Sequence, residues 1–372
     1  MSRPGVGSMA VLLCASAAEA YPHFQLAGDA PTCAACHYAP AGGGMLTDFG
    51  QEQSADPLSG GGNGAFLHGA VTLPRWISVG GDVRLAGLVN DVGSTEGTEV
   101  AAFPMQSDVA VRLGTEQLSV FGVAGLWRPV RSGQGSAVGL PPLRFISREH
   151  YLLWRPSQSD LYVRAGRFHT PYGLRLADHT SYLRRHLGLG LFEEPYAASA
   201  GYVSEAWEIH GTAFVAKPLS PPLRAIGGAL LAEGRVGDAA YGASARSSFA
   251  RTGASHQGGL FAKYWWAGTR LMFVAEIDGV RQTFSAAPDS TRWQLVAYGG
   301  PIWMPVRGLS VGVAYELFAA DLRVSGLERH AIDAWAAFLP WAHFEIMFSA
   351  RAQRIGPDER AWAGILQLHY YL

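Results

Sequence analysis

The sequence is short of charge and of long apolar runs, and each shortage excludes a class of protein. Only 16% of its 372 residues are Asp, Glu, Lys or Arg, against roughly 25% in an average soluble domain. The 29 basic and 30 acidic residues nearly cancel, so we expect no basic surface for nucleic acid. No apolar run reaches the roughly 18 residues that a transmembrane helix needs, which excludes helical membrane spans.

Cysteine is also scarce, with three in the whole chain. Cys33 and Cys36 stand three positions apart, and His37 follows directly. Covalent attachment of haem c needs two thiols at this spacing and a histidine immediately after the second. The sequence therefore predicts one haem c, joined by thioethers to Cys33 and Cys36, with His37 as the proximal iron ligand.

Three alternative interpretations of the cysteine pair remain. A zinc site would need a second pair of ligands at a similar spacing, and none is present. A redox-active dithiol would need a strand–helix context, whereas the flanks here are rich in Ala, Gly and Pro. A structural disulfide would not require the histidine.

The residues around the motif resemble a known family. An aromatic-led segment precedes the cysteines, and a proline, a Gly-rich turn and a Leu-Thr-x-Phe-Gly signature follow them. The matching residues are Pro40, Gly42, Gly43, Gly44, Leu46, Thr47, Phe49 and Gly50. This segment of about thirty residues resembles the N-terminal module of outer-membrane, porin-like barrels that carry one haem c motif, which implies a periplasmic haem and a membrane barrel.

Four regions are predicted along the chain. Residues 1–20 have the charged start, short apolar run and small-x-small end of an export signal, which contains Cys14 and would be removed before Tyr21. Residues 21–58 form the haem segment, which is too short to build a good core alone. Residues 59–74 form a linker whose Gly-rich part, 59–64, predicts a flexible tether, and residues 75–372 form the barrel.

Apolar and polar residues alternate with period two from residue 75 onward, as in strands with one apolar and one polar face. We predict an all-β fold: an antiparallel transmembrane barrel of about 14 strands, with 16 as the alternative. The predicted strands are 75–90, 104–114, 118–128, 147–156, 158–168, 201–216, 224–234, 256–266, 269–280, 292–304, 308–320, 330–340, 343–353 and 361–372.

The connections between these strands favour an outer-membrane barrel over a soluble β-sandwich. Every second connection is expected to be short, at 115–116, 156–157, 218–222, 267–268, 305–308 and 340–341, while 129–146, 169–200 and 235–255 are long. Short turns on one rim and long loops on the other are typical of such barrels. Trp154, Trp266, Trp303 and Trp341 stand beside short turns, where an aromatic girdle is expected. The terminal Leu372 departs from the Phe or Trp that commonly ends such chains.

The longest predicted loop is basic. It opens with Gly-Arg-Phe-His-Thr-Pro-Tyr-Gly at residues 166–173, which resembles a segment of phosphate-selective porins. The loop also contains Arg175, His179, Arg184, Arg185 and His186. Folded into the lumen, Arg175, Arg184 and Arg185 would form a constriction that favours anions; on the outside they would be solvated charges with no specific role.

The second axial ligand of the haem iron is left open by the sequence. Met45, His68 and His23 are the candidates, and lumen-facing histidines of the barrel or an open coordination site are further alternatives. We expect the haem segment to pack in or against the periplasmic mouth of the barrel. The predicted lining of the haem pocket is Tyr38, Met45, Leu46 and Phe49.

Two functions from different classes follow. The first is electron transfer at the periplasmic side of the outer membrane, with membrane lipid around the barrel and a periplasmic redox partner such as another cytochrome. The alternative is a porin for anions or small solutes, in which the haem segment is a plug, sensor or structural element. No catalytic constellation is evident, so we expect no enzyme, although peroxidase-like haem chemistry remains a weaker option. The sequence does not fix the oligomeric state.

Overall fold

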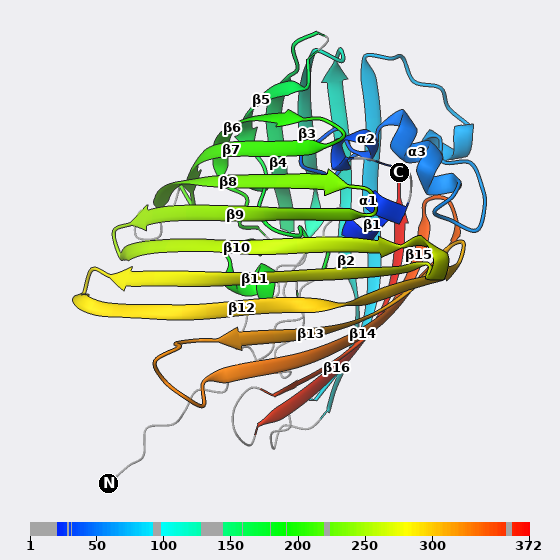
Figure 1. The fold of residues 1–372 in the computed structure, drawn as a ribbon. Coiled ribbons are helices and arrows are strands. Elements are labelled where there is room, and N and C mark those ends of the chain that lie inside the picture. Colours follow the sequence, from blue (N-terminus) through cyan, green and yellow to red (C-terminus); the bar gives the residue numbers. More distant parts are fainter. Residues whose placement is uncertain are drawn as a thin grey trace.

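The computed structural model describes residues 21–27, 30, 32–91, 98–127, 144–157, 159–178, 180–190, 192–218, 224–354 and 359–372. Sixteen antiparallel strands close into one barrel, each hydrogen-bonded to its neighbour in sequence, and β1 pairs with β16 (Figure 1). The predicted barrel is confirmed, with the alternative strand count. The predicted export signal lies outside the described residues.

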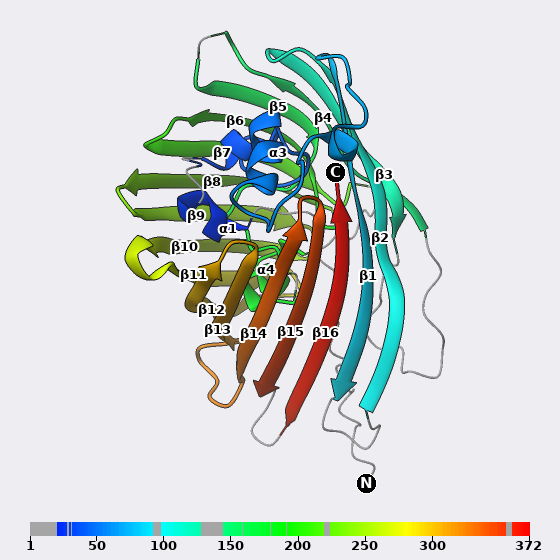
Figure 2. The same ribbon diagram turned by 90° about the vertical axis from the view of Figure 1, so that its right-hand side faces the viewer.

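The strands vary in length. Their bounds are β1 Ile77–Asp91, β2 Thr98–Gly114, β3 Leu118–Trp127, β4 Arg144–Trp154, β5 Leu161–Arg167, β6 Tyr196–Val203, β7 Trp207–Ala216, β8 Ala225–Val236, β9 Ala239–Ala250, β10 Gly253–Trp266, β11 Leu271–Phe284, β12 Ala287–Val306, β13 Leu309–Ala319, β14 Glu328–Trp341, β15 Phe344–Arg354 and β16 Arg360–Tyr371. Because the strand number is even, β1 begins and β16 ends at the same rim. We call this the terminal rim; Figure 2 shows the C-terminus there, at the end of β16.

The period-two pattern of the sequence becomes an apolar outside and a polar inside. On β1, Val83 and Leu85 are 45% and 50% exposed on the outer face, while Asp82 and Arg84 point into the lumen. The other strands repeat this alternation, because successive side chains of a strand point to opposite faces. A closed barrel with an outward apolar belt is typical of a wall surrounded by lipid.

Aromatic side chains mark both ends of the belt. Trp154, Trp266, Trp303 and Trp341 are exposed beside turns of the terminal rim, which confirms the predicted girdle. A second set of exposed aromatic residues, near the opposite rim, consists of Phe145, Phe249, Trp293 and Trp362. Two aromatic girdles are expected where a barrel meets both interfaces of a bilayer.

The count of 14 strands is wrong for two reasons. The predicted strand 201–216 is two strands, β6 and β7, with a turn at residues 204–206. The predicted long connection 235–255 contains β9, whose sequence AAYGASARSSFA is too rich in small residues to show an apolar alternation. As a result, the β7–β8 connection lies at the opposite rim, and two connections of that rim, 251–252 and 285–286, are short rather than long.

The N-terminal segment lies inside the barrel mouth at the terminal rim. It contains α1 Pro22–Ala27, α2 Cys33–Cys36, α3 Asp48–Ala55 and the 3-10 turn η1 Phe66–Gly69. Helix α1 lies against β10 and β11, and α2 packs on α3. Figure 1 shows α2 and α3 beside the C-terminus, and Figure 2 shows α3 there from the side. No helix in the described part of the chain is long and apolar enough to cross a membrane.

The linker is bound to the barrel at its start, which differs from the flexible tether expected there. Ser59 is fully buried, and the Arg307 guanidinium donates to its carbonyl. The Gly60 amide donates to Leu339 O at 2.8 Å, and the Ala342 amide donates to Gly61 O at 2.8 Å. A glycine-rich composition gives backbone freedom, but these hydrogen bonds to the barrel edge remove it.

Candidate haem site

A single helical turn presents the two thiols. Thr32 caps α2, since its hydroxyl accepts from the Ala35 amide at 3.1 Å, and the His37 amide donates to Cys33 O at 3.0 Å. The three-residue spacing of Cys33 and Cys36 therefore becomes one turn, and both side chains line the same cavity. The two thiols are free.

Thr47 joins the thiol turn to the next helix. Its hydroxyl donates to Ala35 O at 2.6 Å and accepts from the Gly50 amide at 3.0 Å, which caps α3. The close approach requires glycine at position 50, because a Cβ there would lie 2.1 Å from Cys36 O. The Leu-Thr-x-Phe-Gly signature thus fixes α2 against α3.

His37 leaves the thiol turn in an extended conformation and pairs with Leu46. Its Nδ1 lies 3.3 Å from Gly44 O. A proton on Nδ1 would donate to that carbonyl and leave the Nε2 lone pair for a metal, as is usual for metal-binding histidines. Burial lowers the pKa of His37 to about 4, so the ring is neutral at pH 7.

The cavity at these residues lies between the haem segment and the barrel wall. It encloses about 1460 Å³ of space between atoms, including the part that opens to solvent. The haem segment lines the cavity with apolar side chains, namely Phe24, Met45, Leu46 and Leu58. The barrel wall lines it with charged groups, including Arg84 and Arg148.

These residues fit a c-type haem. The thiols and a neutral imidazole are the groups that the covalent and iron bonds require. The apolar residues suit a macrocycle. The Arg84 guanidinium suits a propionate carboxylate, whereas Arg148 is already paired with Glu194. Among the described residues, no group of three or more His, Cys, Asp or Glu side chains could hold a metal ion by itself.

Of the four residues predicted to line the haem pocket, two line this cavity. Met45 and Leu46 line the cavity, whereas Tyr38 and Phe49 do not. The Tyr38 ring lies 5.9 Å from Phe121 and its hydroxyl lies 3.1 Å from Ser78 Oγ, so it docks the segment on the wall. Phe49 is 38% exposed. The prediction failed for these residues because sequence proximity to the motif does not determine which side of a short turn faces the cavity.

The three candidate distal ligands are separated by the structure. Met45 lines the same cavity as His37, so it stays a candidate. His68 is exposed and lies outside the cavity, with its ring 4.8 Å from that of His343. His23 is buried and lines a different cavity.

Two other histidines line the cavity at the thiols, which we call the haem cavity: His169 of the long connection and His369 of the barrel wall. Both ring nitrogens of His369 face carboxylates, with Nε2 2.6 Å from Asp82 and Nδ1 3.1 Å from Glu345. The Tyr21 hydroxyl donates to Glu345 at 2.8 Å. The sequence alone left lumen-facing histidines as an open alternative; period-two alternation in β16 is the signal that places His369 inside.

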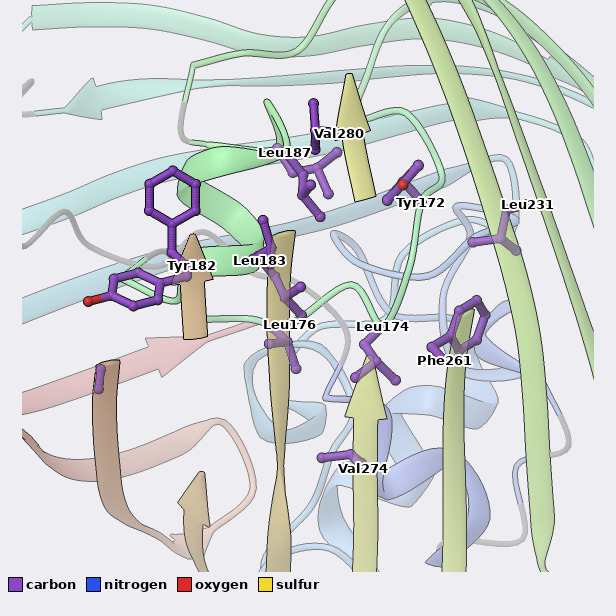
Figure 3. Close-up of a cluster of buried hydrophobic side chains, with 14 of the residues drawn as sticks. Tyr172, Leu174, Leu176, Tyr182, Leu183, Leu187, Leu231, Phe261, Val274 and Val280 are labelled. Atoms are coloured by element: carbon purple, nitrogen blue, oxygen red, sulfur yellow. The ribbon is translucent and has the colours of Figure 1, made fainter. Parts of the chain in front are cut away.

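The long connection 168–195 folds into the lumen, as one of the two interpretations predicted. Its buried apolar residues pack on the inner wall, where Figure 3 shows Leu174 and Leu187 close to Val274 and Val280. The short helix α4 Tyr182–His186 belongs to this connection. The remaining members of the cluster drawn there include Tyr172, Leu176, Tyr182, Leu183, Leu231 and Phe261.

The basic residues of this loop are largely neutralised or buried. Arg175 donates to Glu208 at 2.9 Å and to Ala41 O of the haem segment at 2.6 Å. Arg184 is 3% exposed and donates to Leu176 O at 2.8 Å, and Arg185 is half-buried. Arg175 and Arg184 line a small cavity with the Gly-rich turn at residues 42–44. His179 lies outside the described residues.

A buried polar cluster holds α1 to the wall. The Gln25 amide donates to Glu233 at 2.8 Å and accepts from Lys263, and Lys263 donates to Glu233 at 2.6 Å. All three side chains are at least nine-tenths buried. Because each group has charged or polar partners, the cluster fixes the segment in one orientation, which confirms the prediction that the segment packs in the barrel mouth.

Comparison with solved structures identifies the architecture. OmpT with a deleted loop L8, from Vibrio cholerae, superposes with a TM-score of 0.60 at 11% identity, covering 80% of this chain and 99% of that one. The anion-selective porin from Comamonas acidovorans gives 0.59 at 11% identity over 80% and 99%. The fold is that of an outer-membrane porin.

A third solved structure has a similar fold. The outer membrane channel DcaP of Acinetobacter baumannii gives a TM-score of 0.56 at 11% identity over 80% of this chain and 97% of that one. No family model matches the chain, and no curated protein matches it. At this identity the likeness concerns the fold alone.

Proposed function

We propose that this chain is an outer-membrane barrel that carries one covalently bound haem c and takes part in electron transfer. One observation supports this most: Cys33, Cys36 and His37 converge on a cavity in the mouth of a porin-type barrel. A thiol pair and an adjacent imidazole, held at the edge of one cavity, are what haem attachment requires.

The haem, when bound, supplies a one-electron couple, and the residues of the chain position it. Cys33 and Cys36 would hold the macrocycle by its edge, and Gly44 O orients the ring of His37. Arg84 in the cavity wall would pair with a propionate carboxylate. The loop 168–195 and α1 limit access of water from the lumen.

The proposed location is the bacterial outer membrane, with the haem on the periplasmic side. The apolar belt, the two aromatic girdles and the porin fold support a membrane location, and short turns beside the haem segment support the periplasmic side. A single haem cannot cross a hydrocarbon core of roughly 30 Å. A periplasmic redox partner such as another cytochrome is therefore part of the proposal.

Haem attachment is tested by the double variant Cys33→Ala/Cys36→Ala, produced in a host that matures c-type cytochromes. The wild-type protein should keep haem on a denaturing gel, whereas the double variant should lose all haem staining. Met45→Leu is the matched control, because it lines the cavity but makes no covalent bond. Equal staining of the double variant and the wild type would exclude the covalent site.

A solute channel is the second candidate, in which the haem segment acts as a plug, sensor or structural element. It is supported by the solved neighbours, which are described as an outer membrane channel and an anion-selective porin. Purified protein in planar bilayers distinguishes the two: steady anion-selective current supports the channel, and a sealed barrel with a reversible haem couple supports electron transfer.

We propose no enzymatic activity. Peroxidase-like chemistry would require a vacant iron position. Absorption spectra that show low-spin, six-coordinate iron in both redox states would argue against it, whereas high-spin iron together with peroxide turnover would support it.

A further inference from the structure

The inner wall of the barrel changes from polar to apolar above the haem cavity. On β1 the lumen-facing positions are Asp82 and Arg84, then Ala86 and Leu88. Strand β15, which is separated from β1 by β16, passes from Glu345 to Met347 in the same direction. Lumens of outer-membrane barrels are ordinarily polar, so this apolar band is a departure from the porin pattern.

The band surrounds a second cavity, of about 1220 Å³ between atoms. Its apolar lining also includes Phe103, Met105, Ile302, Trp335 and Ile365. Tyr21 and Ala177 line both this cavity and the haem cavity, so the two spaces adjoin. A concave, mostly apolar surface with a few convergent polar groups is the usual form of a small-molecule site.

His23 supplies a polar group to this apolar cavity. Its side chain is 2% exposed, and within the described part of the chain its Nε2 has no hydrogen-bond partner. Its ring lies 5.7 Å from Trp335, with 35° between the planes. Burial lowers the pKa of His23 to about 3, so the ring is neutral. An unpaired buried nitrogen is destabilising, and a hydrogen bond to a ligand oxygen would remove that penalty.

The charges around the cavity select against ions. Arg351 donates to Glu316 at 3.0 Å and to Asp333 at 2.7 Å, so two carboxylates already neutralise its charge. Asp178 adds a further negative group to the lining. An anion would meet this excess of carboxylates, and a hydrated cation would lose its water against apolar walls.

We propose that this cavity binds a neutral, planar, largely apolar molecule of the quinone or phenol class, with an oxygen hydrogen-bonded to His23 Nε2. The ring of the ligand lies against Trp335 and the apolar band. This site lies beyond the proposed haem function and does not require it, because none of the haem-attaching residues lines the second cavity.

Three probes of the same ring size test the ligand class on the full-length oxidised protein in detergent. The probes are 1,4-naphthoquinone, naphthalene and 2-naphthoate, with calorimetry as the readout. We expect saturable binding of the quinone, binding of naphthalene roughly two- to tenfold weaker for want of one hydrogen bond, and no binding of the anion.

Matched variants distinguish binding in the cavity from partition of the probe into detergent. Met347→Trp fills the cavity and should abolish quinone binding, whereas Phe348→Trp makes the same change one residue along on the outer face and should leave it intact. His23→Phe should weaken quinone binding roughly two- to tenfold, to the level of naphthalene. His68→Phe, outside both cavities, should have no effect.

Three results would overturn the proposal. Equal uptake by the Met347→Trp and Phe348→Trp variants would show partition into detergent only. Tighter binding of 2-naphthoate than of the quinone would refute the charge argument. Quinone binding that appears only in the Cys33→Ala/Cys36→Ala variant would show that the band covers haem. Failure of haem attachment with retained quinone binding would instead refute the haem proposal alone.

Discussion

The substitution Gln25→Ala should loosen the haem segment from the barrel. Gln25 is 6% exposed and bonds to both Glu233 and Lys263. Hydrogen bonds to charged groups contribute roughly 1.5–3 kcal/mol each. Because Glu233 and Lys263 still pair with each other at 2.6 Å, we use the lower end of that range and expect a loss of about 3 kcal/mol in docking free energy.

A loss of that size raises the undocked population roughly 100-fold. Proteolysis of a native protein follows the population of the open form when opening is fast relative to cleavage. The rate of cleavage within residues 21–58 of the intact barrel should therefore rise by about the same factor, measured by mass spectrometry of the released peptides. Other contacts of the segment, such as Tyr21 with Glu345 at 2.8 Å, remain in the variant.

Gln51→Ala is the matched control. Gln51 lies in α3 of the same segment, and its side chain makes no hydrogen bond to any described residue. The Gln51→Ala variant should be cleaved at the same rate as the wild type. Equal rates for the Gln25→Ala variant and the wild type would show that the buried cluster does not hold the segment.

Two further predictions concern the helix junction and the loop. Gly50→Ala should lower haem incorporation, measured by haem staining, and destabilise the segment by about 1–3 kcal/mol in a thermal melt, since the added Cβ meets Cys36 O. Gly61→Ala is the control, because a Cβ there would have no atom within 4 Å, and it should change neither quantity. Glu194 should make the loop 168–195 sensitive to acid. Burial raises the pKa of this carboxyl, but Arg148 outweighs that effect and holds it well below its usual range. The ionised Glu194 carboxylate thus stabilises the loop fully above about pH 4.5. This stabilisation is lost as the pH falls through the lower pKa that Glu194 has in the folded protein. Hydrogen exchange of the loop should show this loss, and Glu194→Gln should remove the pH dependence; an unchanged profile would contradict the assignment.

Local patterns in the sequence were sufficient for the features that depend on a few neighbouring residues. The spacing of Cys33, Cys36 and His37 is set within one helical turn, so no distant contact is needed to predict it. Apolar alternation in strands such as β1 and β16 reports which face meets lipid, because the period of a strand is two. The tryptophans beside the short turns were predictable from the sequence, because an aromatic girdle is expected at the membrane interface.

Features that depend on partners distant in sequence were decided by tertiary structure. The outer face of β9 has mostly small residues besides Tyr241 and Phe249, so its alternation is weak in the sequence, and pairing with β8 and β10 makes it a strand. His369 enters the haem cavity because β16 closes the barrel against β1. His23 lines the second cavity, whereas Phe24 and Gln25 of the same helix line the haem cavity. The Gly-rich linker is held by backbone bonds to Leu339 and Ala342. Composition specifies the freedom of a segment, whereas its position depends on hydrogen bonds and burial that form only when the barrel is complete.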